Sequence, residues 1–177
     1  MEIAEVFSRL ESQFGSDSGL SLYTDAIDPW IEVPTEHIAA VCTYLRDDPD
    51  LLFNHLNDLC GVDYLETDEK KAAKAGFEPH VEVVYQLSSF DLKHRIKLKV
   101  MLPRWQDDEQ GRIPRIPTVS SVFGIADWHE RECFDLVGIE FVGHPNHKRI
   151  LCPDDWIGHP LRKDYEFPLE YHGIRGK

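Results

Sequence analysis

The sequence has few cysteines, and they are widely spaced. Its four cysteines, Cys42, Cys60, Cys133 and Cys152, are separated by 18, 73 and 19 positions, and no C-x-x-C pair occurs. An iron–sulfur cluster normally takes several thiolates that lie within a few residues of one another, and disulfide frameworks use similarly dense spacing. We therefore expect isolated, buried thiols and no cluster held by this chain.

Long apolar runs are also missing. The longest stretch free of Asp, Glu, Lys and Arg runs from Ile116 to Ala126, which is 11 residues, whereas a membrane-spanning helix needs about 20 apolar residues. The N-terminal segment from Met1 to Glu5 is acidic, while a secretory signal begins with basic residues. The sequence therefore predicts a chain without a membrane span, on the cytoplasmic side.

The motifs that bind nucleotides or present a serine nucleophile are absent from the sequence. No G-x-G-x-x-G, no G-x-x-x-x-G-K-[ST] and no G-x-S-x-G elbow occurs. These patterns cradle phosphates or expose a reactive hydroxyl. The sequence therefore gives no motif that supports dinucleotide binding, nucleotide binding or serine-hydrolase activity.

One segment has the outline of a zinc helix. The run His129-Glu130-Arg131-Glu132-Cys133 matches H-E-x-x-H with cysteine as the second ligand. His144 and His147 would complete a set of four ligands, so a zinc-dependent hydrolase is a remote alternative. The competing interpretation is a charged helix face in which Asp127 pairs with Arg131 at i,i+4.

Basic residues are scarce in the first half of the chain. The whole sequence has 32 Asp and Glu against 19 Lys and Arg, a net charge of −13. Residues 1–92 carry 19 acids and 5 bases, net −14, and residues 93–177 carry 13 acids and 14 bases, net +1. An acidic balance repels nucleic-acid backbones and anionic lipid headgroups. Nucleic acid is therefore not an expected partner.

The patterns that are present predict an α+β domain. The 177 residues, 42% of them hydrophobic, suffice for a core without metal or disulfide staples. Apolar residues recur at helical spacing from Ile3 to Phe14 and from Ile38 to Leu45, where Pro34-Thr35-Glu36 opens the helix. Trp30 to Val33 predicts a brief strand.

Three further segments alternate between apolar and polar residues, as strands do. They are Cys60 to Tyr64, Val81 to Leu87 and Ile96 to Leu102, with Ser88 to His94 joining the last two as a hairpin. The charged segment Glu66 to Gly76 is typical of a loop or short helix. The basic positions Lys97 and Lys99 are explained by cross-strand pairing with acids such as Glu82.

The second half is expected to hold one long helix and a tail. Pro103 to Pro117 is a polar loop, and a helix begins at Thr118 or Ser120 and ends at Gly138. Residues 138–177 contain four prolines and five glycines, too many breakers for a long helix or a central strand. We predict an α+β domain over residues 1–137 and an extended Pro/Gly-rich C-terminal tail over residues 138–177.

The tail carries more aromatic surface than a solvated linker would display. Its aromatic residues include Phe141, Trp156, Tyr165, Phe167 and Tyr171. It therefore wraps its own domain or docks on another polypeptide. The segment Gly158 to Tyr165, called the strap below, is rich in anchor residues. Pro160 biases it toward extended backbone, which predicts a strap lying across a partner.

A long composite signature lies in the C-terminal half. It consists of Glu130-Arg131-Glu132, Phe134-Asp135-Leu136, Gly138-Ile139, Phe141, Gly143-His144-Pro145-Asn146, Arg149-Ile150-Leu151, Trp156 and the strap, with Gly61-Val62-Asp63-Tyr64 as a weaker extension. This signature closely resembles the family of the C subunit (30 kDa-type) of proton-translocating NADH:quinone oxidoreductase, respiratory complex I. Val137 and His147 depart from the family pattern, in which an aromatic and an aliphatic residue are common.

The resemblance implies a two-layer α+β fold with a mixed sheet and a non-redox structural subunit of the peripheral arm. Such a chain braces the subunits that pass electrons from NADH through iron–sulfur clusters to quinone, coupled to proton translocation. It is part of a translocase but is expected to be non-catalytic alone. No cofactor is expected in this chain, since FMN, the iron–sulfur clusters and quinone belong to other subunits.

The resemblance also implies partners and a place in the cell. The partners are other complex I subunits, chiefly the D subunit and neighbouring hydrophilic-arm subunits, at the cytoplasmic face of the bacterial inner membrane. Related complexes with similar subunits are the alternative: a membrane-bound hydrogenase, an NDH-type complex or an F420H2 dehydrogenase.

We expect no catalytic, cofactor-binding or metal residues, and we expect aromatic and charged anchors at the partner interface. The predicted interface residues are Trp156, His159, Arg162, Lys163, Asp164 and Tyr165, with Arg131 and Glu132 as weaker candidates.

Overall fold

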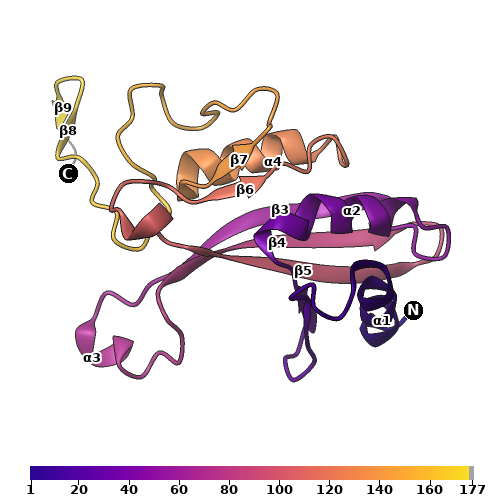
Figure 1. The fold of residues 1–177 in the computed structure, drawn as a ribbon. Helices are drawn as coiled ribbons and strands as arrows, with labels where there is room; N and C mark the ends of the chain where they lie inside the picture. The colour runs from indigo at the N-terminus through magenta and orange to yellow at the C-terminus, as the bar shows by residue number, and fades with distance from the viewer. Residues whose placement is uncertain (176–177) are drawn as a thin grey trace.

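The computed structural model describes residues 1–175 and has the predicted α+β architecture, with helices packed on a mixed five-stranded sheet (Figure 1). The strands are β1 (Ser21–Tyr23), β2 (Trp30–Glu32), β3 (His55–Tyr64), β4 (His80–Ser89) and β5 (His94–Pro103). Their spatial order is β1-β2-β5-β4-β3. Only β2 and β5 pair in parallel within this sheet, with Ile31 opposite Leu98, and the other neighbours are antiparallel.

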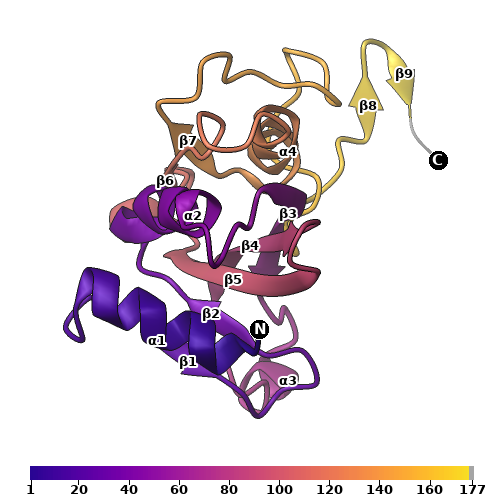
Figure 2. The ribbon, with the colours of Figure 1, turned by 90° about the vertical axis from the view of Figure 1, so that its right-hand side faces the viewer.

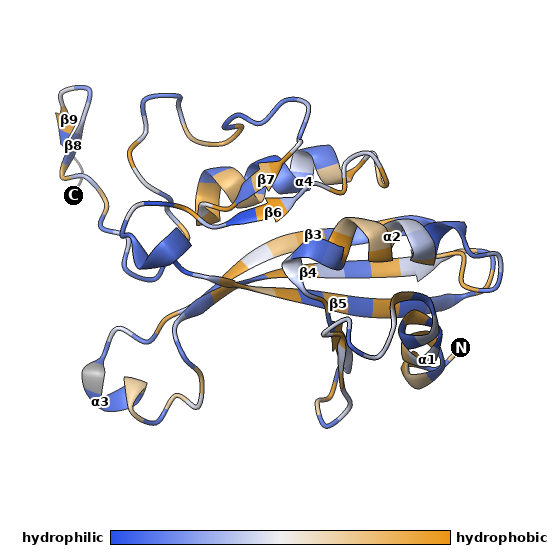
Figure 3. Ribbon diagram, in the orientation of Figure 1, coloured by the Kyte–Doolittle hydropathy of each residue, from blue (hydrophilic) through white to orange (hydrophobic). Residues whose placement is uncertain are grey.

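The hairpin of β4 and β5 forms as predicted, because each strand alternates apolar and polar residues. The core face of the two strands consists of Val81, Val83, Tyr85, Leu87, Ile96, Leu98, Val100 and Leu102, and Glu82, Val84 and Ser89 of β4 are buried as well. The alternation is visible as orange and blue bands along the strands in Figure 3. On the polar face, Lys99 donates to Glu82 (2.9 Å) and Lys97 to Asp28 (3.2 Å), which confirms pairing as the explanation of these lysines.

The N-terminal helices bury the stripes that the spacing predicts. Helix α1 (Ile3–Phe14) buries Val6 and Leu10, and α2 (Ile38–Asp47), which follows a 3-10 turn over Thr35–His37, buries Ile38, Val41, Cys42 and Leu45. The side chain of Phe14 meets Tyr44 edge to face, with ring centres 6.0 Å apart. Helix α1 therefore packs against α2 as well as the core.

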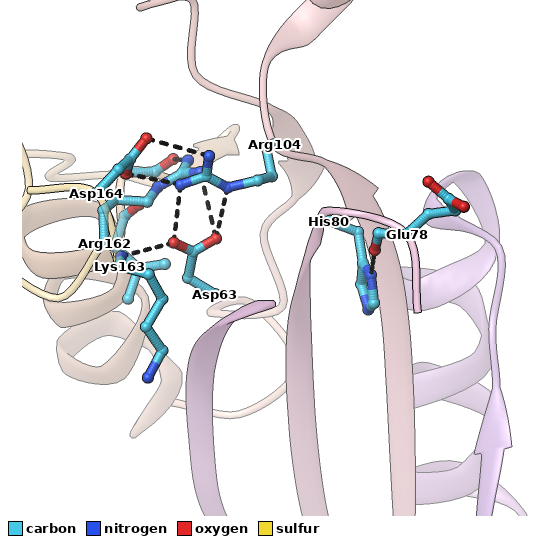
Figure 4. Close-up of polar contacts among 9 residues, drawn as sticks. Asp63, Glu78, His80, Arg104, Arg162, Lys163 and Asp164 are labelled. Atoms are coloured by element: carbon cyan, nitrogen blue, oxygen red, sulfur yellow. Dashed lines mark hydrogen bonds and ion pairs between the residues drawn. The ribbon is translucent and has the colours of Figure 1, made fainter. Parts of the chain in front are cut away.

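The excursion between β3 and β4 projects away from the sheet (Figure 1). It contains only the short helix α3 (Glu69–Ala72), which agrees with the prediction of a loop or short helix. At its base the rings of Tyr64 and His80 stack, 4.5 Å apart, and a ring nitrogen of His80 lies 2.6 Å from the carbonyl of Glu78 (Figure 4). These contacts close the excursion where it leaves the sheet.

A second layer, formed by α4 and two short strands, lies over the sheet. It differs from the sequence prediction in two respects. The predicted helix from Thr118 or Ser120 begins only at Ala126, as α4 (Ala126–Glu132), and continues as a π-helical turn over Cys133–Val137. The cause is Glu130, whose buried carboxylate accepts the hydroxyl of Thr118 and the N–H of Val119 (2.7 Å). Those bonds hold residues 118 and 119 outside the helix.

The segments expected to be irregular on both sides of this helix contain short strands. Strand β6 (Arg115–Pro117) and β7 (Glu140–Val142) pair in parallel, with Ile116 opposite Phe141. Ile139 and Phe141 belong to the core, so the compact domain continues past residue 137. After β7, the described chain has no regular element until the hairpin of β8 (Glu170–Tyr171) and β9 (Ile174–Arg175), which projects from the body in Figures 1 and 2.

The sequence prediction of two other strands was incomplete. Strand β3 begins at His55 rather than Cys60, and β1 was missed. A bulge between Leu56 and Asp58 breaks the alternation at the start of β3, which hides the strand from a period-two pattern.

Candidate partner-docking site

The strap crosses its own domain at the ends of β3 and β5. The N–H of Leu161 donates to the carbonyl of Leu136 (2.8 Å), at the π-helical turn. Arg162 donates to the carbonyls of Val137 and Gly138, the latter at 3.1 Å. The strap is therefore hydrogen-bonded to the end of the α4 helix.

An ion-pair network, called the latch below, fixes the strap to the sheet (Figure 4). Arg104, which follows β5, donates to Asp63 of β3 through Nε (2.7 Å) and Nη2 (2.9 Å). The same guanidinium donates to Asp164 of the strap (2.8 and 3.2 Å). The N–H of Lys163 adds a bond to Asp63 (2.8 Å). One arginine thus joins two strands and the strap.

Charge and burial explain the electrostatics of the latch. The carboxylate of Asp63 is fully buried, and two bonds from one guanidinium match its two oxygens. The hydrogen bond from Arg104 holds the pKa of Asp164 below its usual value. Burial lowers the pKa of Arg162, although Asp63 opposes this. The guanidinium of Arg162 also lies 4.7 Å from the ring centre of Trp105, a cation–π contact.

A second anchor precedes the strap. The Oδ2 atom of Asp135 accepts three successive backbone N–H groups, from Ile150, Leu151 and Cys152 (2.7 to 3.0 Å). Arg149 donates to Oδ1 (2.6 Å) and also to the carbonyl of Gly158 (2.9 Å). The buried side chain of Asp135 is therefore a main anchor of the strand-free segment after β7.

Gly138 is required where the helix ends against the strap. Its φ of +74° is the left-handed conformation that ends many helices. A Cβ built there would lie 2.5 Å from Cδ2 of His159. His159 in turn places Nδ1 3.1 Å from the carbonyl of Asp135. A side chain at position 138 would strain the backbone and displace the strap.

The predicted interface residues divide into inward and outward groups. Arg162 is only 6% exposed, and Trp156, His159 and Tyr165 are half-buried. The Trp156 ring lies 5.1 Å from that of Tyr171, and the Tyr165 ring lies 4.9 Å from that of Phe167. Lys163 and Asp164 are exposed. Contact of these residues with a partner stays a prediction. Of the exposed pair, Asp164 is bound by Arg104, whereas the side chain of Lys163 forms no ion pair among the described residues.

The two weaker candidates lie on α4. Arg131 is buried and donates to the carbonyl of Lys148 (3.1 Å), with its guanidinium 5.1 Å from the ring centre of Trp128. The predicted pairing with Asp127 is replaced by these contacts, because the chain after β7 covers this face of the helix. Glu132, the next residue, is exposed.

Sequence reasoning missed Asp63, Arg104 and Asp135 as site residues. Asp63 and Asp135 lie within the segments that carry the resemblance, but nothing in the sequence marks them as buried. The latch joins residues 41 and 60 positions apart. A charged residue next to a predicted strand end, as at Arg104, is the one available signal.

The residues of the zinc alternative have other partners. His147 accepts the N–H of Phe141 (3.1 Å), and His144 places Nε2 3.0 Å from the carbonyl of Asp127. Cys133 is buried, and burial raises the pKa of its thiol. Within residues 1–175, no group of three or more His, Cys, Asp or Glu side chains is placed to hold a metal ion.

Large apolar side chains remain exposed on α4, on the strap and on its flanks. They include Trp128, Leu151, Ile157, Leu161, Phe167 and Leu169, with Ile157 88% exposed. Large apolar side chains that are exposed in a contiguous patch mark contact with another molecule. The strap is an internally bonded segment that exposes Leu161 together with the charged Lys163 and Asp164.

Comparison with known proteins identifies the family. The family model of the respiratory-chain NADH dehydrogenase 30 Kd subunit matches residues 31–171. The C subunit of NADH-quinone oxidoreductase from Herpetosiphon aurantiacus is 39% identical over 97% of this chain and 87% of its own length. The same subunit from Roseiflexus castenholzii is 47% identical over 79% of this chain and 71% of its own length.

A solved structure shares the fold. A chain of the membrane-bound sulfane sulfur reductase, an archaeal respiratory membrane complex, superposes with a TM-score of 0.66 at 20% identity, over 94% of this chain and 86% of that chain. Together with the match over residues 31–171, the identity to bacterial relatives places the chain in a known group: it belongs to the respiratory-chain NADH dehydrogenase 30 Kd subunit family, which includes the C subunit of NADH-quinone oxidoreductase.

Proposed function

We propose that this chain is a non-redox structural subunit that braces the peripheral arm of a proton-translocating NADH:quinone oxidoreductase. The observation that carries the proposal is the strap, whose polar groups bond to its own domain. Its Leu161 and the flanking residues Ile157 and Phe167 remain exposed. A segment fixed in this way presents its apolar side without the entropy cost of ordering on binding.

The proposed role is positional. Electron transfer depends on fixed distances between redox groups, and a rigid chain can hold the subunits that carry them. We propose that FMN, iron–sulfur clusters and quinone are bound by those other subunits, and that the D subunit is the main neighbour. This agrees with the scattered cysteines, of which Cys42 and Cys133 are buried in the core.

The proposed location is the cytoplasmic face of the bacterial inner membrane, reached through the partner subunits. No helix within residues 1–175 is both long enough and apolar enough to cross a membrane. The exposed apolar side chains around the strap are the proposed contact with those partners.

The test is co-purification. A tagged full-length chain, isolated from cells that express the whole complex, is expected to bring down the other subunits in fixed ratio, identified by mass spectrometry. The free chain is expected to be colourless and inactive in NADH oxidation. A stoichiometric flavin or cluster absorbance in the free chain would contradict the structural role. Co-purification with a hydrogenase or F420H2-oxidising module instead would assign it to a related complex.

A further inference from the structure

A small cavity opens between the edge strand β3, helix α4 and the strap. Its volume is about 130 Å³, and its walls come from residues 58–61, from His129, Glu132 and Leu136, and from Leu161. Pockets for cofactors or drug-sized ligands measure about 300–1,000 Å³. This cavity is therefore too small for such a ligand and suits a single side chain.

The cavity has an apolar interior and an acidic rim. Leu136, Val137 and Leu161 supply apolar walls. Asp58, whose side chain is 42% exposed, and the exposed Glu132 supply two carboxylates. His129 lies 3.5 Å from Asp58. Lys97, whose charge acts on Cys60, is paired with Asp28 (3.2 Å).

Among the described residues, Glu132 forms no ion pair with a Lys or Arg, so its charge is available to another molecule. Lys and Arg side chains match this combination, because they lay an apolar stem along apolar surface and keep the charged end at the rim. An aliphatic side chain would fill the walls but leave the carboxylates unused. Charge complementarity therefore favours a basic occupant.

We propose that this cavity is a socket for one Lys or Arg side chain of a partner in the complex. The stem lies against Leu136 and Leu161, and the charged end pairs with Glu132 and Asp58. The proposal rests on the proposed function, since it needs the chain to be part of a complex, and it deepens that function by naming the chemistry of one contact.

The latch completes the socket. Leu161 belongs to the strap and closes one wall, and its place is set by the bond to Leu136 and by Asp164 three residues later. Weakening the latch should therefore open the socket without altering its acidic rim. Asp164→Asn removes the charge that binds Arg104 and keeps nearly the same shape.

Cys60 supplies a local readout of the socket. Its half-buried thiol lines the cavity, whereas Cys133 beside it is only 3% exposed. Burial and the neighbouring Asp58 raise the pKa of Cys60, so alkylation must be followed at mildly alkaline pH. Peptide mass spectrometry after iodoacetamide treatment distinguishes Cys60 from Cys152, the other half-buried thiol.

The experiment compares the full-length chain free and in the purified complex. Alkylation of Cys60 is expected to be at least about tenfold slower in the complex, since reactivity follows exposure of the thiol. In complexes carrying Glu132→Gln, the rate is expected to return about tenfold toward that of the free chain, because an unpaired interface charge costs a large part of the contact. The matched control Glu36→Gln, an exposed acid on another element, is expected to leave the protection unchanged.

Further outcomes separate the proposals. If Cys60 alkylates equally fast in the free chain and in an intact complex, the socket is wrong while the proposed function stands. If the wild-type chain brings down no other subunits of the complex, the proposed function fails first.

If Leu161→Ala restores alkylation but Glu132→Gln and Asp58→Asn do not, the occupant is apolar and the basic side chain is excluded. Asp164→Asn is expected to act like Leu161→Ala, and protection equal to wild type would overturn the role of the latch.

Discussion

Two buried carboxylates, one near the C-terminal end of α4 and one in the π-helical turn that follows it, have pKa values shifted in opposite directions. Glu130 and Asp135 are both fully buried and lie five residues apart. Burial raises the pKa of Glu130 from 4.5 to about 7, and the bonds from Thr118 and Val119 oppose this only in part. Burial acts in the same direction on Asp135, but three backbone N–H groups and Arg149 bring its pKa down from 3.8 to about 2.

The difference teaches that burial alone does not set the charge of a carboxylate. Glu130 receives two neutral donors. The imidazole of His144 lies 3.9 Å from this carboxylate and accepts the N–H of Asn146 at Nδ1 (3.0 Å). Asp135 receives a guanidinium and a cluster of N–H groups that bind the charged form. The number and charge of the donors decide which carboxylate stays ionised.

Among the substitutions that test this difference between the two carboxylates, Asp135→Asn is expected to have the largest effect on stability. The substitution removes the charge that Arg149 and three N–H groups bind, and leaves Arg149 without its carboxylate. Breaking a buried ion pair costs about 3 kcal/mol, so we expect a loss of this size in the free energy of unfolding, measured with urea at pH 7. The exposed Asp154→Asn serves as the control. A loss below about 1 kcal/mol, the level of a surface pair, would show that the Asp135 cluster adds little.

Glu130→Gln tests the other carboxylate through pH. Because the folded pKa lies above the unfolded one, the stability that Glu130 contributes is fully present below pH 4.5 and is lost as pH rises through about 7. The variant lacks this loss, so its stability relative to wild type should rise by roughly 2 kcal/mol between pH 5 and pH 8. Melting temperatures at the two pH values measure this. Glu109→Gln, an exposed acid, should follow wild type, and parallel curves for Glu130→Gln would refute the shift.

The pH dependence of the stability that Asp135 contributes has the opposite sign. Its folded pKa lies below the unfolded one, so its stabilisation is present above pH 3.8 and is lost as pH falls through about 2. The two carboxylates therefore respond to different ends of the pH scale, and neither change masks the other.

The smallest effect is expected for Thr118→Val, which tests a single hydrogen-bond donor to Glu130. Thr118→Val keeps the shape of the side chain and removes the hydroxyl that binds Glu130. Loss of one hydrogen bond to the ionised form should raise the pKa of Glu130 by about one further unit. The loss of stability still begins near the unfolded pKa of 4.5, but the pH at which it levels off should move up accordingly, as followed by melting temperature between pH 5 and 9. The exposed Thr24→Val is the control, and an unchanged profile would mean that the hydroxyl does not stabilise the carboxylate.

Local patterns predicted the first half of the fold well. The hairpin of β4 and β5 and helix α1 were found because their apolar residues recur at two or 3.6 positions. The start of α4 was wrong because Thr118 and Ser120 look like N-caps, whereas Thr118 bonds to Glu130, 12 positions on. Strands β6 and β7 were missed because three residues beside prolines carry almost no periodic signal.

The site was only half predictable. The resemblance directed attention to the strap, and the charges of Arg162 and Asp164 marked them as anchors. Which way those anchors point depends on Asp63 and Arg104, which are remote in sequence. The sequence does not distinguish an arginine that reaches a partner from one that bonds to its own backbone. Arg162 was expected at an interface, whereas in the structure it is only 6% exposed within its own domain.

The bond from Lys163 to Asp63 joins residues 100 positions apart, and this separation sets an order of events during folding. The latch contacts of the strap cannot form until β3 and β5 have brought Asp63 and Arg104 together, although its bonds to the end of α4 do not depend on them. Closing a loop of this length carries an entropy cost that only a preassembled contact surface can offset. Strand pairing between β3, β4 and β5 needs far shorter loops. The latch that holds the surface proposed for partners is thus completed only after the sheet has formed.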